Sequence, residues 1–340
     1  MIKLFLKRIL VSNKELLLAF SFLIKLKNSK SYFKHINGHK TFNQFVYSSK
    51  KLPFFPISLI IDNNMYGIEY IVRRYSKINN FLMYYIEHGI FFGNHIQSDQ
   101  LNYFSKKYLV PSSIRSDFLK ACNNNIKVVA IGPYIHYANI INLKYLRTKK
   151  GKTLLFFPDH TTASILIQQN IKKNIDLINR IKKDYQITNV IISLFYLDLD
   201  NSHIKKYKEM GYNIFCAGSK WDYNFMDRLK SVISISDLTI SNSVGTHIGY
   251  CIYLNKPHTI VNTSYKKKYN YSHKLINNVI NSELNTTRAI QTNEIHKYFF
   301  REDKSIYLEI NKEQYNICSK YWGFEFIRSE TEMFDILNEK

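Results

Sequence analysis

The sequence predicts an α/β fold with two consecutive parallel sheets, each covered by helices. Short apolar runs alternate with longer amphipathic segments along most of the chain, which is the pattern of parallel strands joined by helical crossovers. The chain has 340 residues, of which 45% are hydrophobic and 22% are charged. These values are typical of a globular protein, and the length suits two domains that each have a core of their own.

The first series of elements fills the N-terminal part of the chain. We expect its helices over 67–77 and from about residue 114, because apolar residues recur there at helical spacing. The expected strands are 55–62, 81–86, 108–111 and 126–131.

A second series of elements starts at residue 153. Its expected strands are 153–157, 189–195, 212–216, 237–240 and 258–261. Helices fit between them, notably over 164–185 and 247–254, and a further amphipathic helix is expected over 317–337. The chain therefore divides into 1–150, 151–316 and a C-terminal helical piece, 317–340. The first two parts are expected to be Rossmann-like domains that face a cleft.

The turn that follows the apolar run 238–240 is the strongest clue to function. Small polar residues occupy it, Ser241-Asn-Ser-Val-Gly-Thr246, and a helix is expected to start at His247. Free N–H groups at the positive end of a helix favour a phosphate group. The alternative is that the turn only caps the helix, since Ser, Asn and Gly also serve that purpose.

Two further strand ends carry polar residues and favour the ligand-binding interpretation. The run 154–158 is followed by Asp159-His-Thr-Thr162, and the run 212–217 is followed by Gly218-Ser-Lys220. The carboxyl ends of parallel strands share one edge of a sheet, which is where ligands gather.

The positive charge of the chain is concentrated in its first part. The whole chain carries a formal net charge of +22. Residues 1–150 contain 23 Lys and Arg against 6 Asp and Glu, a net charge of +17, and the other 190 residues contain 25 against 20, a net charge of +5. Such an excess of basic residues points to an anionic partner, although biased codon usage would also raise the lysine content.

A short apolar stretch, 16–24, lies in the most basic part of the chain. Nine residues are too few to span a bilayer, which takes roughly 20, and no cleavage site typical of a secretory signal follows. Basic residues around a short apolar helix favour a segment that lies on an anionic membrane surface. The alternative is an ordinary first helix.

Cysteine usage favours a reducing compartment. Four cysteines are widely spaced and no CxxC pair occurs, so the sequence indicates neither a disulfide framework nor a zinc site. We expect a cytoplasmic protein, peripheral on the inner face of a bacterial membrane if the basic part contacts lipid.

Four short pieces of the sequence, spread over residues 55–265, resemble the GT-B glycosyltransferases with which bacteria build capsule or lipopolysaccharide sugar chains. The pieces are 86–89, 131–137, 157–160 and 241–250. The resemblance implies two Rossmann-like domains and transfer of a sugar from a nucleotide-sugar donor to a lipid-linked or oligosaccharide acceptor. The chain departs from the related sialyltransferase pattern at His88, where a second acidic residue is usual, and in the reversed dipeptide Pro257-His258.

The resemblance also implies roles for individual residues. Glycosyl transfer needs a base that accepts the proton of the acceptor hydroxyl and groups that stabilise the departing phosphate. Glu87 or His88 is expected to be the base, and His136 is expected on the acceptor side. The residues expected to bind the donor are His160, Thr161, Thr162, Gly218, Lys220, Asp222, Ser241, Asn242, Gly245, Thr246 and His247.

A structural role is the alternative for each of these residues. Asp222, for example, would cap a helix and pair with Arg228 instead of accepting a hydrogen bond from a sugar or ribose hydroxyl. Asp198-Leu-Asp200 is the nearest match to a metal-binding Asp-x-Asp motif, but it follows a strand in an acidic loop. We expect a metal-independent reaction with the nucleotide-sugar as substrate and no cofactor.

Two other functions compete with glycosyl transfer. A nucleotide-sugar 2-epimerase shares the fold but would need acidic residues paired across the cleft, and few acidic residues mark the strand ends. A nucleic-acid-binding protein would explain the positive charge, yet no RNA-recognition, helix-turn-helix or zinc signature is evident. We therefore expect no nucleic acid among the partners.

Overall fold

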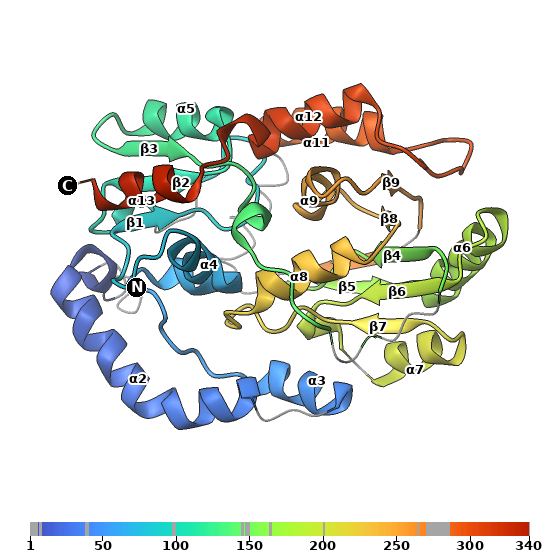
Figure 1. Ribbon diagram of the computed structural model, residues 1–340, viewed down its shortest axis with the longest axis horizontal. Helices are drawn as coiled ribbons and strands as arrows, with labels where there is room; N and C mark the ends of the chain where they lie inside the picture. Colours follow the sequence, from blue (N-terminus) through green and yellow to red (C-terminus); the bar gives the residue numbers. More distant parts are fainter. Residues whose placement is uncertain are drawn as a thin grey trace.

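The computed structural model confirms the α/β prediction, with two separate parallel sheets flanked by helices (Figure 1). It describes residues 6, 9–37, 41–96, 100–143, 146, 150–162, 165–199, 201–263, 265–269 and 286–339.

The first sheet contains three parallel strands in the order β1-β2-β3. Tyr85 of the first strand lies opposite Tyr108 of the second, and both rings are buried. The strands and their helices are β1 (Tyr84–Ile86), β2 (Lys107–Val110), β3 (Lys127–Ala130), α4 (Ile68–Tyr75) and α5 (Ser113–Cys122).

The second sheet contains five parallel strands in the order β7-β6-β4-β8-β9. They are β4 (Thr153–Phe157), β6 (Asn189–Ser193), β7 (Asn213–Phe215), β8 (Leu238–Ser241) and β9 (His258–Ile260). The helices of this half are α6 (Ile171–Asp184), α7 (Asn201–Glu209), α8 (Phe225–Ser234) and α9 (His247–Tyr253). The chain builds outward from β4 to β7 on one side and then from β8 to β9 on the other, which is the Rossmann order.

The central strands form because their sequences are apolar on both faces. All five residues of β4 and all four of β8 are buried. Parallel strands covered by helices on both sides bury both faces, so near-continuous apolar runs are expected in them. Leu155, Ile191 and Ile240 are fully buried at the middle of this sheet.

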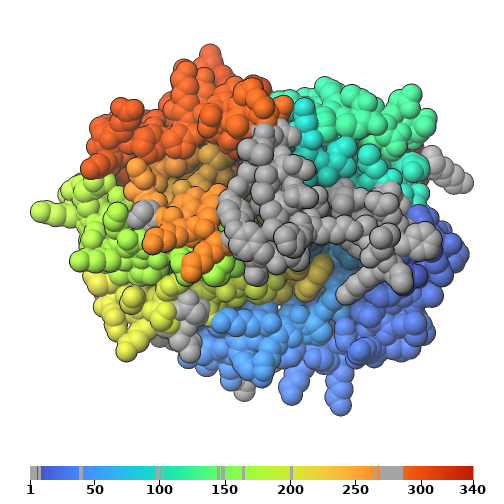
Figure 2. Space-filling model, turned by 180° about the vertical axis from the view of Figure 1, so that it is seen from behind, coloured from blue at the N-terminus to red at the C-terminus, as the bar shows by residue number. Residues whose placement is uncertain are grey.

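The molecule has a first half, built around the three-stranded sheet, and a second half, built around the five-stranded sheet. Segments at both ends of the chain join these halves. The N-terminal arm consists of α2 (Lys14–Asn37) and α3 (Phe42–Lys51), and it runs along one side of the molecule in Figure 1 and along its lower edge in Figure 2. Phe45 of α3 packs into the core of the second sheet. The C-terminal helices α11 (Thr286–Phe299) and α12 (Lys312–Trp322) run along the opposite side in Figure 1. The last helix, α13 (Glu330–Asn338), lies beside the first sheet, where the Tyr84 hydroxyl donates to the carbonyl of Ile336 at 2.7 Å.

A salt bridge also connects the halves. Arg74 of α4 donates two hydrogen bonds, both of 2.7 Å, to the carboxylate of Asp227 in α8. Asp227 is almost fully buried, and bidentate geometry of this kind is among the stronger ion-pair arrangements. Several strong contacts therefore connect the parts that the sequence divides at residues 150 and 316. The division into domains stays a prediction.

The expected strand at 55–62 does not form. The Asn64 side chain holds this stretch in a turn, because its oxygen accepts the N–H groups of Ile57 (2.6 Å) and Ser58 (2.8 Å). Its amide nitrogen donates to three carbonyls of the same segment, those of Ser58, Ile60 and Ile61. Asparagine commonly competes with regular structure in this way.

The expected helix at 164–185 is shorter than predicted, because its first residues form a strand. β5 (Ile165–Gln169) pairs in antiparallel fashion with β10 (Tyr265–Tyr269). Asn170 then caps α6 by accepting the N–H of Lys173. Short apolar runs fit either a strand or a helix, so periodicity alone does not separate the two.

The expected C-terminal helix at 317–337 is divided by Gly323. This residue has a φ of +69° and ends α12 in the left-handed conformation that glycine adopts most easily. A β-carbon there would also collide with the carbonyl of Pro111. The break lets the following residues turn back toward the first sheet.

We expect Gly249→Ala to destabilise the protein by about 1–3 kcal/mol through overpacking. A β-carbon at Gly249, in α9, would collide with the buried indole ring of Trp322 in α12. At a solvent-exposed helix position the same change would stabilise the protein by roughly 0.5–1 kcal/mol. The sign of the change in stability therefore shows whether Trp322 packs against this position. Urea denaturation measures it, and an equally or more stable variant would show that α12 does not pack on α9 in this way.

Candidate functional site

A cavity of about 350 Å³ lies where the carboxyl ends of the two sheets face each other. The first half contributes the residues after β1, His88-Gly-Ile-Phe91. The second half contributes the end of β4 with the residues after it, 157–160, the end of β6, 193–195, and the turn after β8, 243–247. β4 and β8 are neighbours at the point where the strand order reverses. In open α/β sheets this switch point is where ligands bind.

The cavity brings together five of the residues predicted from the sequence. These are His88, His160, Gly245, Thr246 and His247. The other predicted residues are outside the lining, namely Glu87, His136, Thr161, Thr162, Gly218, Lys220, Asp222, Ser241 and Asn242.

His247 is a partly buried residue at the wall of the cavity, with its Nε2 atom shielded from solvent. Its ring stacks on Phe157, with centroids 4.9 Å apart, and its Nε2 has no hydrogen-bond partner among the residues that the structure describes. Burial lowers the pKa of His247 to about 3, and the charge of His160 contributes in the same direction. The ring is therefore neutral at pH 7.

Gly245 allows the turn to approach this ring closely. A β-carbon at Gly245 would lie 2.9 Å from both Cε1 and Nδ1 of His247, closer than a side chain tolerates. The absence of a side chain thus keeps the backbone of the turn and the imidazole side by side at the cavity.

His88 faces the same cavity from the first half. Its ring centroid lies 5.4 Å from that of Phe91 and 6.1 Å from that of Tyr66. Burial lowers the pKa of His88 to about 4, with Glu87 opposing the shift and Lys220 adding to it. A neutral imidazole at this position is able to accept a proton.

Glu87 is committed to a buried ion pair instead. The Arg115 Nε donates to both of its oxygens at 2.9 and 2.8 Å, and the Arg115 Nη2 donates to Oε1 at 2.6 Å. The side-chain amide of Gln100 donates to the same oxygen at 2.6 Å. Glu87 is fully buried, so its placement favours His88 over Glu87 as the proton acceptor.

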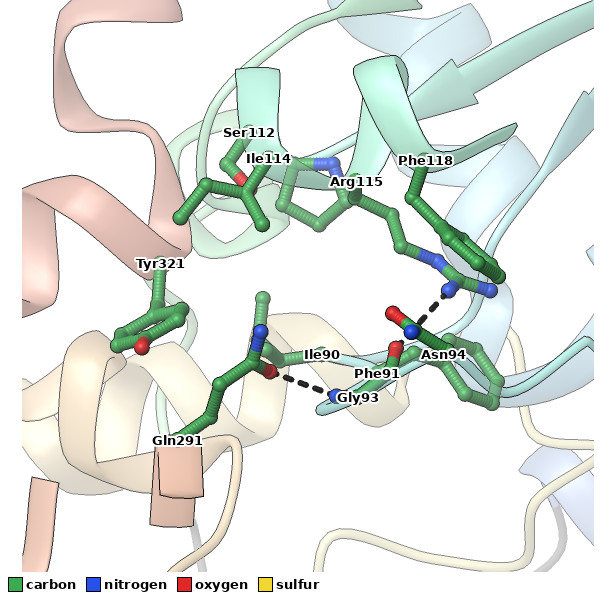
Figure 3. A pocket seen from close by; sticks show the side chains of 11 residues that line it. Ile90, Phe91, Gly93, Asn94, Ser112, Ile114, Arg115, Phe118, Gln291 and Tyr321 are labelled. Atoms are coloured by element: carbon green, nitrogen blue, oxygen red, sulfur yellow. Dashed lines mark hydrogen bonds between the residues drawn. The ribbon is translucent and has the colours of Figure 1, made fainter. Parts of the chain in front are cut away.

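Arg115 also organises a small hollow beside the cavity (Figure 3). Its guanidinium extends toward Gly93, whose carbonyl accepts from Nη1 at 3.5 Å. Gln291 of α11 accepts the N–H of Gly93 at 2.6 Å, and Tyr321 of α12 lies opposite Ile114. The C-terminal helices thereby hold the loop that follows β1.

The side chains of the turn after β8 build the turn itself. The Ser241 hydroxyl donates to the carbonyl of Ser243 at 2.8 Å and lies 3.0 Å from Nε2 of His258. Asn242 accepts the N–H of Asp159 at 2.6 Å and donates to Thr263 at 2.8 Å. These two side chains are therefore engaged within the turn, and the cavity is bordered instead by the residues that follow, 243–247.

Thr246 fastens the turn to the first half. Its hydroxyl accepts the N–H of Ile90 at 3.2 Å, and its carbonyl accepts the indole N–H of Trp322 at 2.9 Å. A β-carbon at Gly89 would lie 3.1 Å from that hydroxyl. Segments far apart in the sequence therefore meet at this one residue.

The threonines after β4 serve the strand that follows. The Thr161 hydroxyl accepts the N–H of Ile167 at 3.1 Å, and the Thr162 hydroxyl accepts the N–H of Ile165 at 3.1 Å. Asp159 and His160, in contrast, line the cavity, and the ring of His160 lies 4.8 Å from that of Phe195.

The residues after β7 form a structural group. Asp222 accepts from Arg228 at 2.7 Å and from the N–H of Asn224 at 2.9 Å, which is the structural alternative considered for it. A β-carbon at Gly218 would lie 2.7 Å from that carboxylate. The ammonium group of Lys220 lies 4.7 Å from the centre of the Trp221 ring.

His136 lies outside the cavity and bridges two tyrosines. Its Nδ1 is 2.6 Å from the hydroxyl of Tyr253, and its Nε2 is 3.3 Å from the hydroxyl of Tyr75. Tyr75 belongs to the first half and Tyr253 to the second, so the His136 ring contributes to the contact between the two halves.

Aromatic residues line the cavity in addition to the residues that the sequence predicts. They are Tyr66, Phe91, Phe157, Phe195, Phe225 and Tyr250. Phe157 ends one strand and Phe195 closely follows another, and this position at a strand end is the only sequence signal that pointed to the cavity. Aromatic residues make up 15% of the sequence and occur near many strand ends. This position therefore hardly distinguishes an aromatic residue of the cavity from one of the core.

Among the described residues, no group of three or more His, Cys, Asp or Glu side chains is placed to hold a metal ion. None of the described helices is both long and apolar enough to cross a membrane.

Comparisons with known proteins give no family. No protein-family model matches the chain, and no curated protein matches it. A solved UDP-GlcNAc 2-epimerase from Neisseria meningitidis, bound to UDP-GlcNAc, is similar over 79% of this chain and 77% of its own, with 12% identity and a TM-score of 0.34. A GtfA/B complex is similar over 78% of this chain, with 8% identity and a TM-score of 0.30, and the chain spans only 53% of that protein's length. Scores this low assign no activity.

We expect His247→Gln to reduce the pH dependence of stability. The pKa of His247 is about 3 in the folded protein and about 6.5 in an unfolded chain. Between these values the unfolded state binds more protons, so stability falls as the pH falls below 6.5. The stability difference between wild type and variant should change by about 1.4 kcal/mol per pH unit in this range, as measured by urea denaturation. A difference that stays constant from pH 7 to pH 5 would contradict a buried neutral ring.

Proposed function

We propose that the cavity binds a nucleotide-sugar and that the protein is a glycosyltransferase. The observation that carries the proposal is the position of the cavity, at the switch point of a Rossmann-ordered sheet and opposite the strand ends of a second sheet. Its volume of about 350 Å³ lies within the range of small-molecule sites.

The second half is the donor side in this proposal. The diphosphate of the donor lies against the turn 243–247, where Gly245 leaves no side chain between the turn and the ring of His247. His247 offers its Nε2 to a phosphate oxygen or a sugar hydroxyl, and His160 offers a second polar group. Buried polar atoms usually have partners, so a ligand that supplies one for His247 is favoured. Phe157 and Phe195 provide apolar faces for a base or a sugar ring.

His88 is the general base. The acceptor hydroxyl oxygen attacks the anomeric carbon, the bond from that carbon to the nucleotide phosphate breaks, and Nδ1 or Nε2 of His88 takes the hydroxyl proton. Negative charge develops on the leaving phosphate, and His160, His247 and the turn 243–247 on the opposite wall stabilise it. A partly enclosed site strengthens such interactions. We propose a reaction that needs neither a metal ion nor a cofactor.

The wider role follows from the sequence resemblance. Three of the resembling pieces contribute His88, His160 and the turn 243–247 to one cavity. A bacterial surface polysaccharide, of capsule or lipopolysaccharide type, is the proposed product, and a lipid-linked or oligosaccharide chain is the proposed acceptor. The protein would then act in the cytoplasm.

A nucleotide-sugar 2-epimerase is the second candidate. Titratable side chains of both halves face the cavity, His88 on one side and Asp159 and His160 on the other, as removal and return of a proton would require. Consumption of the nucleotide-sugar without any glycan acceptor would favour this reaction over transfer.

We expect His88→Gln to lower kcat by about 10²-fold or more while donor affinity stays near normal, because the variant loses a proton acceptor and not a donor contact. His247→Ala should instead weaken donor binding. A thermal-shift series with UDP-, GDP-, CMP- and dTDP-sugars identifies the donor, and transfer assays give kcat. Full activity in His88→Gln would remove the histidine from the reaction, and unchanged donor affinity in His247→Ala would remove the donor from this cavity.

A further inference from the structure

Helix α2 has two apolar faces, and only one of them is covered. Leu17, Tyr32 and Ile36 are buried against the body of the protein. Leu16, Leu23, Leu26 and Phe33 are spaced by seven, three and seven residues, which places them together on another side of the helix. They are 44%, 63%, 66% and 42% exposed.

This outer face is a concentration of apolar surface. Nineteen large apolar side chains are exposed in the described part of the chain, and seven of them lie within residues 6–33. Exposed apolar residues that occur singly need no explanation, whereas a contiguous patch marks an interaction site. In Figure 1, α2 lies at the outer edge of the molecule, where a large partner is able to reach it.

Basic residues are interspersed with the apolar side chains of the patch, since Lys30 follows Leu23 by seven residues and Leu26 by four and so lies on the same side of the helix. α2 contains five lysines and one glutamate, and Lys27, Lys30 and Lys34 are exposed beside the apolar side chains. Residues 1–150 as a whole carry a net charge of +17. A second copy of this chain would present the same charge and be repelled, so the charge selects an anionic partner.

A basic hollow adjoins the same helix. Lys25 of α2 and Arg73 of α4 both lie over the ring of Phe81, at 4.5 and 5.6 Å from its centre. Burial, and then the charge of Arg73, lowers the pKa of Lys25. The hollow has a volume of about 590 Å³, and its described lining contains three basic residues and no carboxylate. Arg73 and Arg74 also pair with Glu69 and Asp227, so the hollow adds to the positive charge around α2 mainly through Lys25.

We propose that α2 lies on the surface of an anionic lipid bilayer, with its outer face, defined by Leu16, Leu23, Leu26 and Phe33, inserted among the headgroups. A helix with apolar residues on one side and lysines beside them binds such surfaces by both apolar burial and charge. The inner face of α2 keeps its contacts with the protein. This inference is independent of the reaction in the cavity.

Co-sedimentation with vesicles tests the proposal. The full chain is expected to bind vesicles that contain phosphatidylglycerol, to bind pure phosphatidylcholine vesicles more weakly, and to be released as salt rises. Leu23→Gln combined with Leu26→Gln should weaken binding about tenfold or more, because it removes two inserted side chains. Lys27→Gln, Lys30→Gln and Lys34→Gln together should remove the preference for anionic lipid.

Matched variants elsewhere on the surface serve as controls. Ile290→Gln with Leu308→Gln removes two apolar side chains that are 62% and 51% exposed, and Lys172→Gln, Lys173→Gln and Lys183→Gln remove three exposed lysines of α6. Both sets should bind vesicles like wild type. Unaltered thermal shifts with nucleotide-sugars in the α2 variants would show that the cavity is intact.

Three outcomes would overturn the proposal. The first is equal binding to neutral and anionic vesicles, or none to either. The second is a loss of binding in the control variants as large as in the α2 variants. The third is a dimer in lipid-free solution that Leu23→Gln with Leu26→Gln dissociates, since the outer face would then be covered by a second copy.

Discussion

The hydrogen bonds of Thr246 hold the two halves together across the cavity. Its hydroxyl binds the backbone of Ile90 in the first half, and its carbonyl binds the indole of Trp322 in α12. The loop after β1, the turn after β8 and the C-terminal helices depend on each other at this point. These bonds help to set the separation between the loop that carries His88 and the turn 243–247.

Burial gives the cavity its chemical character. His88 and His247 have lowered pKa values because they are removed from water, and both are neutral under ordinary conditions. A neutral imidazole donates and accepts hydrogen bonds without the cost of burying a charge. The buried carboxylate of Glu87, the residue before His88, is paired with Arg115. The two histidines thus supply polar groups to the cavity without adding a buried charge.

The sequence predicted the sheets better than the roles of single residues. Strands such as β4 and β8 were found because continuous apolar runs are specific to buried parallel strands. β5 was missed because Ile165–Gln169 fits a helix equally well, and the turn at Asn64 depends on side-chain hydrogen bonds that no periodicity records. Glu87 and His88 are neighbours in the sequence, and their roles differ because Arg115 pairs with Glu87 while His88 lines the cavity. The sequence does not show where Arg115 lies. The outer face of α2 was only partly visible, because apolar residues on both sides of a helix obscure its pattern.

Hydrogen–deuterium exchange with and without the nucleotide-sugar that most raises Tm tests the central claim that one ligand binds between the sheets at the switch point. The backbone segments 88–91, 157–160 and 243–247 border the cavity from both halves, and all three should exchange more slowly when the ligand is bound. The segment 311–315, at a separate hollow between α9 and α12, serves as an internal reference. Protection of all three cavity segments, with the reference unchanged, is the result we expect. Protection confined to one half, or found only outside these segments, would contradict a donor site in the cavity.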